Sequence, residues 1–289
     1  TSIEIPNSVT SIGDSAFCFC SSLTSIEIPS SVTSIGDSAF ESCSSLTSIT
    51  LPFIKMHFGY IFGASSSSAN SNYVPETLKE VIITGGKSIG SSAFEGCSSV
   101  TSIEIQSGVT SIGNWAFKYC SSLTSIEISS SVTSIGSSAF SRCSSLTSIE
   151  IPSSVTSIGS SAFEGCSSLT SIEIPSSVTS IGLSAFEYCS SLTGVYITDI
   201  ASWCAIEFGN SSANPLNYAK TKNLYLNNEL VTDLIIPSSV TSIGSYVFYN
   251  CSNVTSIVIP SSVTSIGDSA FSGCSSLTSI EIPSGVTSI

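Results

Sequence analysis

One pattern of apolar and polar positions recurs about every 23 residues along the chain. In residues 144–166, which read SSLTSIEIPSSVTSIGSSAFEGC, Ile149 and Ile151 flank Glu150. This alternation has the period of a β-strand, so we expect a short strand with Glu150 pointing outward. Pro152 has no N–H group for a further ladder bond, and the strand is therefore expected to end there.

The second half of the repeat predicts an extended segment, a corner and a short helical turn. Ile158 belongs to the extended segment, and Gly159 suits the corner because glycine tolerates unusual backbone angles. Ser161 and Glu164 have the spacing of a capping box, which favours a helical turn after Ser161. Phe163 is expected to face inward. One turn buries almost no apolar surface by itself, so the stacking of neighbouring turns must supply the core.

The register of the repeat predicts one elongated domain over residues 1–289. The middle apolar residue of the TSIEIP motif recurs at twelve positions: Ile3, Ile26, Ile49, Val81, Ile103, Ile126, Ile149, Ile172, Val195, Leu234, Ile257 and Ile280. Insertions at residues 53–77 and 199–230 lengthen two of the intervals. A period of about 20–29 residues is typical of leucine-rich-repeat solenoids. We therefore expect an α/β solenoid, predominantly β, of about twelve 23-residue turns with short helical or 3₁₀ segments. The chain starts and stops inside a repeat, so we expect a fragment of a longer protein.

The quoted motif resembles the BspA-like leucine-rich repeat of surface and secreted proteins from mucosa-associated bacteria and some anaerobic protists. The similarity covers essentially the whole chain, and the phased IP…V.SIG..AF..C pattern is specific. Phe58-Gly59 in the first insertion resembles the Ile-Gly corner of a diverged turn. The resemblance implies a cell-surface or secreted location and adhesion to host extracellular proteins, host cells or other microbes. It does not identify the ligand.

Charge and hydropathy exclude several classes of partner. The formal net charge is −13, with 20 acidic and 7 basic residues. Nucleic acids and anionic membranes need basic patches, so we expect no nucleic-acid partner. We expect no membrane-spanning segment, because no apolar run has the length of a transmembrane helix. The expected partner is a protein or glycan ligand on a host or microbial surface, bound by a monomer.

Nine of the eleven cysteines share one phase of the repeat: Cys20, Cys43, Cys97, Cys120, Cys143, Cys166, Cys189, Cys251 and Cys274. Cysteines one turn apart on parallel segments have poor geometry for a disulfide, so we expect a ladder of reduced, buried thiols. A disulfide framework is the alternative for a secreted protein. A metal ladder lacks support, because CxxC motifs and partner histidines are missing. We therefore expect no metal site.

A row of glutamates occupies the outward position of the first strand. It contains Glu4, Glu27, Glu104, Glu127, Glu150, Glu173 and Glu281, of which Glu104 to Glu173 belong to consecutive turns. Stacked carboxylates repel one another, and Ca²⁺ or a basic ligand would relieve that repulsion. The alternative is a solvated face that only improves solubility.

The sequence does not support catalysis in this segment, and we expect neither an enzyme nor a cofactor. His57 is the single histidine, and nothing places it beside a nucleophile and a carboxylate. The glutamates are equivalent copies rather than a pair in different environments. No glycine-rich phosphate loop is present. An alternative function is a non-catalytic, substrate-docking repeat region of a larger secreted enzyme.

The two insertions supply the aromatic residues that a binding site favours. Tyr60 in the first and Trp203 in the second are the best candidates for ligand contact. The glutamate row is interrupted beside both, by Thr50 and by Tyr196. We expect a ligand to contact the strand face near these positions, with Glu104, Glu127, Glu150 and Glu173 contributing charge. The alternative is that the aromatic residues fill the space of a missing regular turn. Asn227-Asn228 in the second insertion predicts a hairpin.

Overall fold

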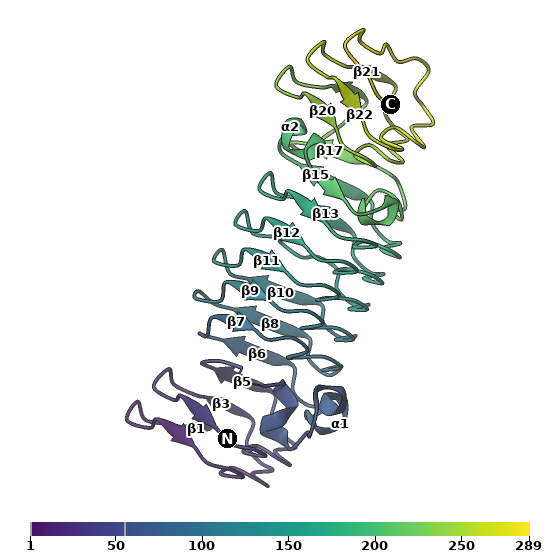
Figure 1. The fold of residues 1–289 in the computed structure, drawn as a ribbon. Helices are drawn as coiled ribbons and strands as arrows, with labels where there is room; N and C mark the ends of the chain where they lie inside the picture. Colours follow the sequence, from purple (N-terminus) through teal and green to yellow (C-terminus); the bar gives the residue numbers. More distant parts are fainter. Residues whose placement is uncertain (1, 55) are drawn as a thin grey trace.

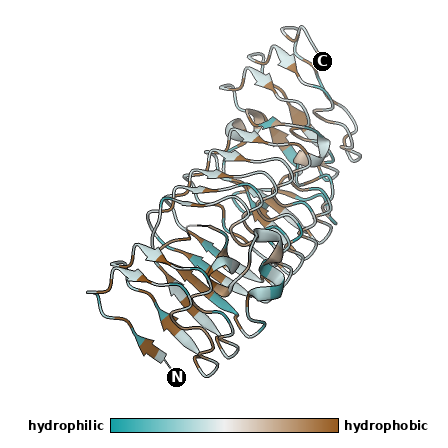
Figure 2. Cartoon of the chain, turned by 60° about the horizontal axis from the view of Figure 1, so that its bottom comes forward, coloured by the Kyte–Doolittle hydropathy of each residue, from teal (hydrophilic) through white to brown (hydrophobic). Residues whose placement is uncertain are grey.

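The structure is a computed structural model that describes residues 2–54 and 56–289. The chain forms one elongated stack of turns, with the N-terminal and C-terminal turns at opposite ends (Figure 1). The strands carry hydrophobic segments at matching places in successive turns (Figure 2). One continuous hydrophobic core includes residues from Ile12 to Cys274. Stacking therefore supplies the core that a single turn lacks.

The first strand of each turn pairs in parallel with its copy in the next turn. A six-stranded sheet contains β1 (Ser2–Glu4), β3 (Ser25–Glu27), β5 (Ser48–Leu51), β6 (Glu80–Ile83), β8 (Ser102–Ile105) and β10 (Ser125–Ile128). A four-stranded sheet contains β13 (Ser171–Glu173), β15 (Gly194–Ile197), β17 (Leu224–Leu226) and β18 (Glu229–Leu230). The strands β19 (Asp233–Ile235) and β21 (Ser256–Val258) form a third sheet. We call the outward surface of these three sheets the strand face.

The second extended segment of each turn forms a further set of parallel ladders. The main one contains β7 (Ser88–Ile89), β9 (Ser111–Ile112), β11 (Ser134–Ile135), β12 (Ser157–Ile158), β14 (Ser180–Ile181) and β16 (Glu207–Phe208). Two shorter ladders pair β2 (Ser11–Ile12) with β4 (Ser34–Ile35), and β20 (Ser242–Ile243) with β22 (Ser265–Ile266). The serine and isoleucine of the regular segments thus lie beside the same residues in the next turn, and β16 places Glu207 and Phe208 beside Ser180 and Ile181.

The helical turn expected after Ser161 is absent, and consecutive hydrogen-bonded turns replace it. Ser161 has φ of 53°, outside the range of a helix N-cap. The amides of Ser161, Phe163 and Gly165 each donate to the next turn of the stack, all at 2.8 Å. The amide of Glu164 donates to the carbonyl of Ser161 at 3.1 Å. A helix cannot form here because every second amide is committed to the neighbouring turn.

Helices in the described residues occur only in the two insertions. The first contains η1 (Phe58–Phe62), η2 (Ser67–Ala69) and α1 (Asn70–Tyr73), and the second contains α2 (Ile200–Cys204) and η3 (Ser211–Ala213). The expectation of a helical or 3₁₀ segment in every turn is therefore wrong, while the solenoid of parallel strands is confirmed.

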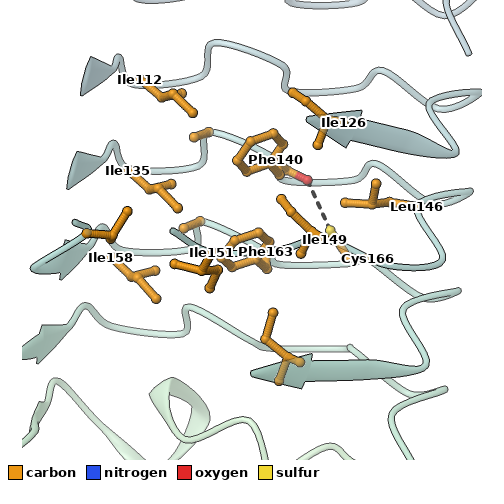
Figure 3. Packing of buried hydrophobic residues seen from close by; sticks show 14 of the residues in the cluster. Ile112, Ile126, Ile135, Phe140, Leu146, Ile149, Ile151, Ile158, Phe163 and Cys166 are labelled. Atoms are coloured by element: carbon orange, nitrogen blue, oxygen red, sulfur yellow. Dashed lines mark hydrogen bonds between the residues drawn. The ribbon is translucent and has the colours of Figure 1, made fainter. Parts of the chain in front are cut away.

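A column of stacked phenylalanine rings runs through the centre of the regular turns (Figure 3). The ring centroids of Phe140 and Phe163 lie 5.4 Å apart, and those of Phe163 and Phe186 lie 5.2 Å apart. The planes of both pairs are tilted by 13° or less. These side chains have no exposed surface. The column exists because each turn repeats the same side chain at the same height.

The expected ladder of free, buried thiols is confirmed for eight of its nine members, and Cys20 is half-buried. The thiols of Cys43, Cys120, Cys143, Cys166, Cys189 and Cys274 each donate to the phenylalanine carbonyl of the preceding turn, as Cys166 does to Phe140 at 3.2 Å (Figure 3). Burial raises the pKa of Cys189 to about 12 and that of Cys43 to about 11. The thiol is thus both a small apolar filler and a weak hydrogen-bond donor.

The first insertion extends the phenylalanine column. The ring of Phe58 lies 4.7 Å from Phe94, and the ring of Phe62 lies 6.4 Å from Phe40. The amide of Phe58 donates to Ala93 at 2.6 Å, which is the bond that the core phenylalanine makes in a regular turn. The expectation that Phe58-Gly59 occupies the Ile-Gly corner is therefore wrong. The second-strand ladder is interrupted at this point, between β4 and β7.

The second insertion contributes β16 to the second-strand ladder and both β17 and β18 to the four-stranded sheet of the strand face. Its strand β16 pairs with β14, and β17 pairs with β15. The hairpin between β17 and β18 turns at Asn227 and Asn228, whose φ angles are 50° and 68°. The predicted hairpin is confirmed, because positive φ at both central residues is the geometry that favours asparagine there.

One predicted strand, over residues 146–151, is absent although its sequence matches the paired strands. The sheets end at β10 on one side and at β13 on the other. Ile149 and Ile151 remain buried, so the core is continuous across the break. Like charges on directly paired strands destabilise a sheet, and the break lies within the run of four glutamates. The strand expected around Ile280 is also absent.

Substituting a corner glycine tests the close approach of the turns. A Cβ atom at Gly159 would lie 2.5 Å from the amide nitrogen of Ser137, whereas no described atom lies within 4 Å of the same position at Gly90. We expect Gly159→Ala to lower the free energy of unfolding by about 3 kcal/mol. Gly90→Ala is the matched control and is expected to change it by less than about 0.5 kcal/mol. Equal losses in urea unfolding would contradict the stacking geometry.

The raised thiol pKa values predict a loss of stability at alkaline pH. The Cys189 thiol has a pKa of about 9 in the unfolded chain and about 12 in the folded protein. Its burial therefore contributes fully to the free energy of unfolding below pH 9, and this contribution falls as the pH rises toward 12. We expect Cys189→Ala to reduce the slope of unfolding free energy against pH by about 1.4 kcal/mol per unit between pH 9 and 11. Urea unfolding at several pH values measures the slope. The exposed Ser190→Ala control should leave it unchanged, and an unchanged slope in Cys189→Ala would contradict the assignment.

Candidate functional site

The strand face carries one row of outward residues in strict register, which we call the outward row. Glu4 lies beside Glu27, Glu27 beside Thr50, and Thr50 beside Ile82. Ile82 lies beside Glu104, and Glu104 lies beside Glu127. After the break, the register pairs Glu173 with Tyr196 and Tyr196 with Tyr225. The third sheet pairs Ile235 with Val258. The row is thus mainly acidic up to Glu173, and it is aromatic or apolar at Tyr196, Tyr225, Ile235 and Val258.

The break in the sheet brings three of the predicted site residues together. Glu150, Glu173 and Tyr196 line one open groove on the strand face, together with Asn228 from the hairpin. Both glutamates are exposed, and Tyr196 is half-buried. Because Glu150 lies outside a paired strand, only Glu104 and Glu127 of the four predicted neighbours stack in register. The groove combines two carboxylates with an aromatic face.

Tyr196 is held in place by two neighbours. Its ring stacks on that of Tyr225 with a centroid distance of 4.7 Å and a tilt of 11°. Gly194 makes room for the ring, because a Cβ atom there would lie 2.7 Å from Cε2 of Tyr196. The paired residue in the preceding turn is Ser171. Glycine therefore replaces serine at the one position where a large outward side chain leans over the strand.

The charge of the groove suits a cationic group. Within the described residues the only ion pair joins Arg142 and Glu164, so no lysine or arginine neutralises Glu150 or Glu173. The described residues contain no group of three or more His, Cys, Asp or Glu side chains that could hold a metal ion. The carboxylates are available to a basic ligand.

Sequence reasoning missed the apolar end of the outward row. Ile235 is 67% exposed and Val258 is 57% exposed, and Leu230 in the hairpin is also exposed. The sequence does contain a signal for this apolar pair, because Ile235 in DLIIP and Val258 in SIVIP replace the glutamate of the SIEIP motif. An exposed apolar pair at a position that is elsewhere acidic is a feature of a binding surface.

The candidates of the first insertion lie apart from this groove. Thr50 lines a separate open groove on the strand face with Glu4 and Glu27. Tyr60 is half-buried and lines a small apolar pocket with Leu51 and His57. Leu51 follows Thr50 in the chain, so the two sites adjoin at β5.

Trp203 is not a surface residue, and the expectation that it emerges as a ligand anchor is wrong. Its side chain is 1% exposed, and its indole N–H donates to the carbonyl of Val247 at 2.9 Å. The ring packs edge-on against Phe208 at 5.3 Å. Asp199 caps the helix that carries it. Its carboxylate accepts from the hydroxyl of Ser202 at 2.6 Å and from the amide of Ser202 at 2.7 Å, and these two bonds lower the pKa of Asp199. The gap-filling alternative is correct for this residue.

The comparisons with known proteins identify the repeat. A family model described as the BspA type leucine rich repeat region matches residues 1–82, 87–213 and 221–289, in six copies. The chain belongs to the BspA-type leucine-rich repeat family. This membership confirms the resemblance seen in the motif.

Solved structures of bacterial leucine-rich repeat proteins are similar to this BspA-type chain. One from Bacteroides ovatus is 26% identical, with 98% of this chain and 75% of that chain covered and a TM-score of 0.43. A leucine rich cell surface protein from Faecalibacterium prausnitzii is 27% identical, with coverages of 97% and 73% and a TM-score of 0.40. A leucine-rich repeat protein from T. pallidum is 24% identical, with coverages of 68% and 77% and a TM-score of 0.42. No curated protein matches.

The BspA-type repeat forms a scaffold that displays side chains on the strand face at fixed spacing. No helix in the described residues is long and apolar enough to cross a membrane. Because its turns stack along one axis, the scaffold is suited to presenting an extended surface rather than a deep pocket.

Proposed function

We propose that this chain is a cell-surface or secreted, non-catalytic module that binds a protein through its strand face and so mediates adhesion to host extracellular proteins, host cells or other microbes. The observation that carries the proposal is the change along the outward row, from Glu150 and Glu173 to Tyr196 and then to the exposed Ile235 and Val258. Membership of the BspA-type family supports the location, because such repeats occur in surface and secreted proteins.

The apolar residues of the outward row favour a protein partner. Burying a side chain such as Ile235 or Val258 contributes about 1.5–3 kcal/mol. In the preceding regular turns a glutamate, which favours solubility, occupies the same position. Exposed apolar side chains at this place favour aggregation of the free protein, and a partner that covers them removes this disadvantage.

The groove favours a basic residue on that partner. An arginine or lysine in it would face two carboxylates and the aromatic ring of Tyr196 together. The stacked pair of Tyr196 and Tyr225 is preorganised, so little side-chain entropy is lost on binding. We therefore expect the bound protein surface to combine basic and apolar residues. Thr50 and Tyr60 offer a second, smaller contact area.

The environment of His57 supports a non-catalytic role. His57 is half-buried, and its Nδ1 lies 3.1 Å from Oδ1 of Asn70, an atom that also accepts the amide of Gly59. The single histidine therefore takes part in holding the first insertion together. Glu127, Glu150 and Glu173 of the outward row are exposed, and Glu104 is half-buried.

Capture experiments with the whole chain test the proposed function. Wild-type protein would be immobilised, exposed to mucosal extracellular proteins, and the bound proteins identified by mass spectrometry. The test variant combines Ile235→Thr and Val258→Thr, because threonine occupies the same outward position at Thr50 in a paired strand and adds no like charges to the directly paired positions. We expect the affinity for a captured protein to fall at least tenfold. Glu150→Gln should mainly weaken the dependence of binding on salt concentration.

A matched control removes one exposed carboxylate outside the strand face. Glu207→Gln, in β16 of the second-strand ladder, should leave binding unchanged. Tyr60→Ala, if the variant stays folded, should cause a smaller loss than the double variant. Unchanged binding in the double variant and in Tyr196→Ala would contradict the proposed site.

A further inference from the structure

We propose that a second site, on the side of the stack formed by the turn segments, binds a carboxylated or sulfated saccharide. The residues that carry it are Trp115, Lys118, Tyr119 and Arg142. They lie in two consecutive turns, outside the strand face and outside both insertions. The proposal does not depend on the strand-face function.

The backbone geometry shows that these aromatic residues are not selected for stability. Trp115 and Tyr119 have φ angles of 58° and 61°, a conformation that bulky residues disfavour. The position of Tyr119 is occupied by glycine in other turns, as at Gly96 and Gly165. Both rings are exposed, by 44% and 46%, and thus add little to the core. Strain and exposure are features of binding residues, and the cations beside its ring distinguish Tyr119 from Tyr188, which has the same backbone conformation and is also exposed.

Two cations gather at the same place in an otherwise acidic chain. Nζ of Lys118 lies 5.0 Å from the centroid of the Tyr119 ring, and Cζ of Arg142 lies 5.9 Å from it. The equivalent position to Lys118 is glutamate in other turns, as at Glu95 and Glu164. The charge is therefore inverted locally, and the tyrosine ring holds both cations beside it.

One nearby carboxylate does not cancel this charge. Glu164 lies 3.8 Å from the guanidinium of Arg142, in a pair that is exposed to solvent. Exposed pairs of this kind are weak, so an incoming anion can displace the carboxylate. Lys118 has no ion-pair partner within the described residues. The site therefore has capacity for at least one anionic group.

The surroundings favour a saccharide over an acidic peptide. An extended peptide needs free backbone groups, but the amides of Trp115, Tyr119 and Arg142 already donate to the next turn, at 2.7–2.9 Å. The positions equivalent to Trp115 in the neighbouring turns are Ser92 and Ser138, so the surface around it is rich in hydroxyl groups. A sugar ring can stack its C–H face on such an indole while its hydroxyls meet the serines.

The two tryptophans make the site directly observable. Trp115 is exposed, and Trp203 is buried, so added iodide quenches the emission of Trp115 selectively. The whole chain would be titrated with a hyaluronan tetrasaccharide, a heparin tetrasaccharide, a chitotetraose and a tetraglutamate peptide. We expect the first two, or one of them, to bind and to protect Trp115 from iodide, while the neutral sugar and the peptide bind at least tenfold more weakly.

Variants that restore the residue of another turn separate binding from folding. Lys118→Glu, Tyr119→Gly and Arg142→Gly each reproduce a regular turn, and each is expected to weaken binding at least tenfold in calorimetry. Trp115→Ser should do the same. Tyr188→Gly is the control, because Tyr188 has the same backbone conformation but lies beside Glu187 instead of a cation. It should bind like the wild type. Failure of both acidic saccharides to bind, equal binding of chitotetraose or tetraglutamate, or unchanged affinity in the restored variants would overturn the proposal.

Discussion

The hydrogen bonds between successive turns are the constraint on which the rest of the structure depends. They run along both strand ladders and along the turn segments, where alternate amides donate to the next turn. This bonding fixes the rotation of each turn relative to its neighbour, so each side chain stacks on its own copy. The spacing of about 5 Å between the rings of Phe140, Phe163 and Phe186 follows from it. The same bonding brings the turns so close together that position 159 has room only for glycine and position 166 carries the small thiol of cysteine. The near-identity of the repeats is thus a physical requirement of the packing, as well as a trace of duplication.

The surfaces that differ from the repeat are the ones with capacity for recognition. Regular turns present glutamate, serine and threonine, and the threonine hydroxyls are used to bond the preceding turn, as Thr156 does with Thr133 at 3.3 Å. Binding capacity is found where this pattern changes: at the groove beside Tyr196, at Ile235 and Val258, and at the cations around Tyr119. The core tolerates these changes because the changed side chains point outward, while Ile149 and Ile151 keep it continuous across the break in the sheet.

The sequence predicts the period, the strands, the inward residues and the hairpin, because each depends on local chemistry repeated many times. It does not predict the backbone after Ser161, where bonds to the next turn compete with a helix. The break at Ile149 has no local signal either, since the same SIEI letters form paired strands at Ile103 and Ile126. The burial of Trp203 depends on Val247, which is 44 residues away. Ile235 and Val258 were predictable from the glutamate positions alone. The site was therefore only partly predictable, because it forms where distant segments meet.

Hydrogen exchange in Phe163→Ala, followed by mass spectrometry on the whole chain, tests most directly the claim that stability resides between neighbouring turns. Removing the ring deletes stacking with Phe140 and Phe186 on both sides. We predict that amides in the turns of all three residues exchange faster than in the wild type, while those of residues 80–105 keep their rates. Faster exchange confined to the turn that contains residue 163 would contradict the account, because it would show that each turn is stable on its own.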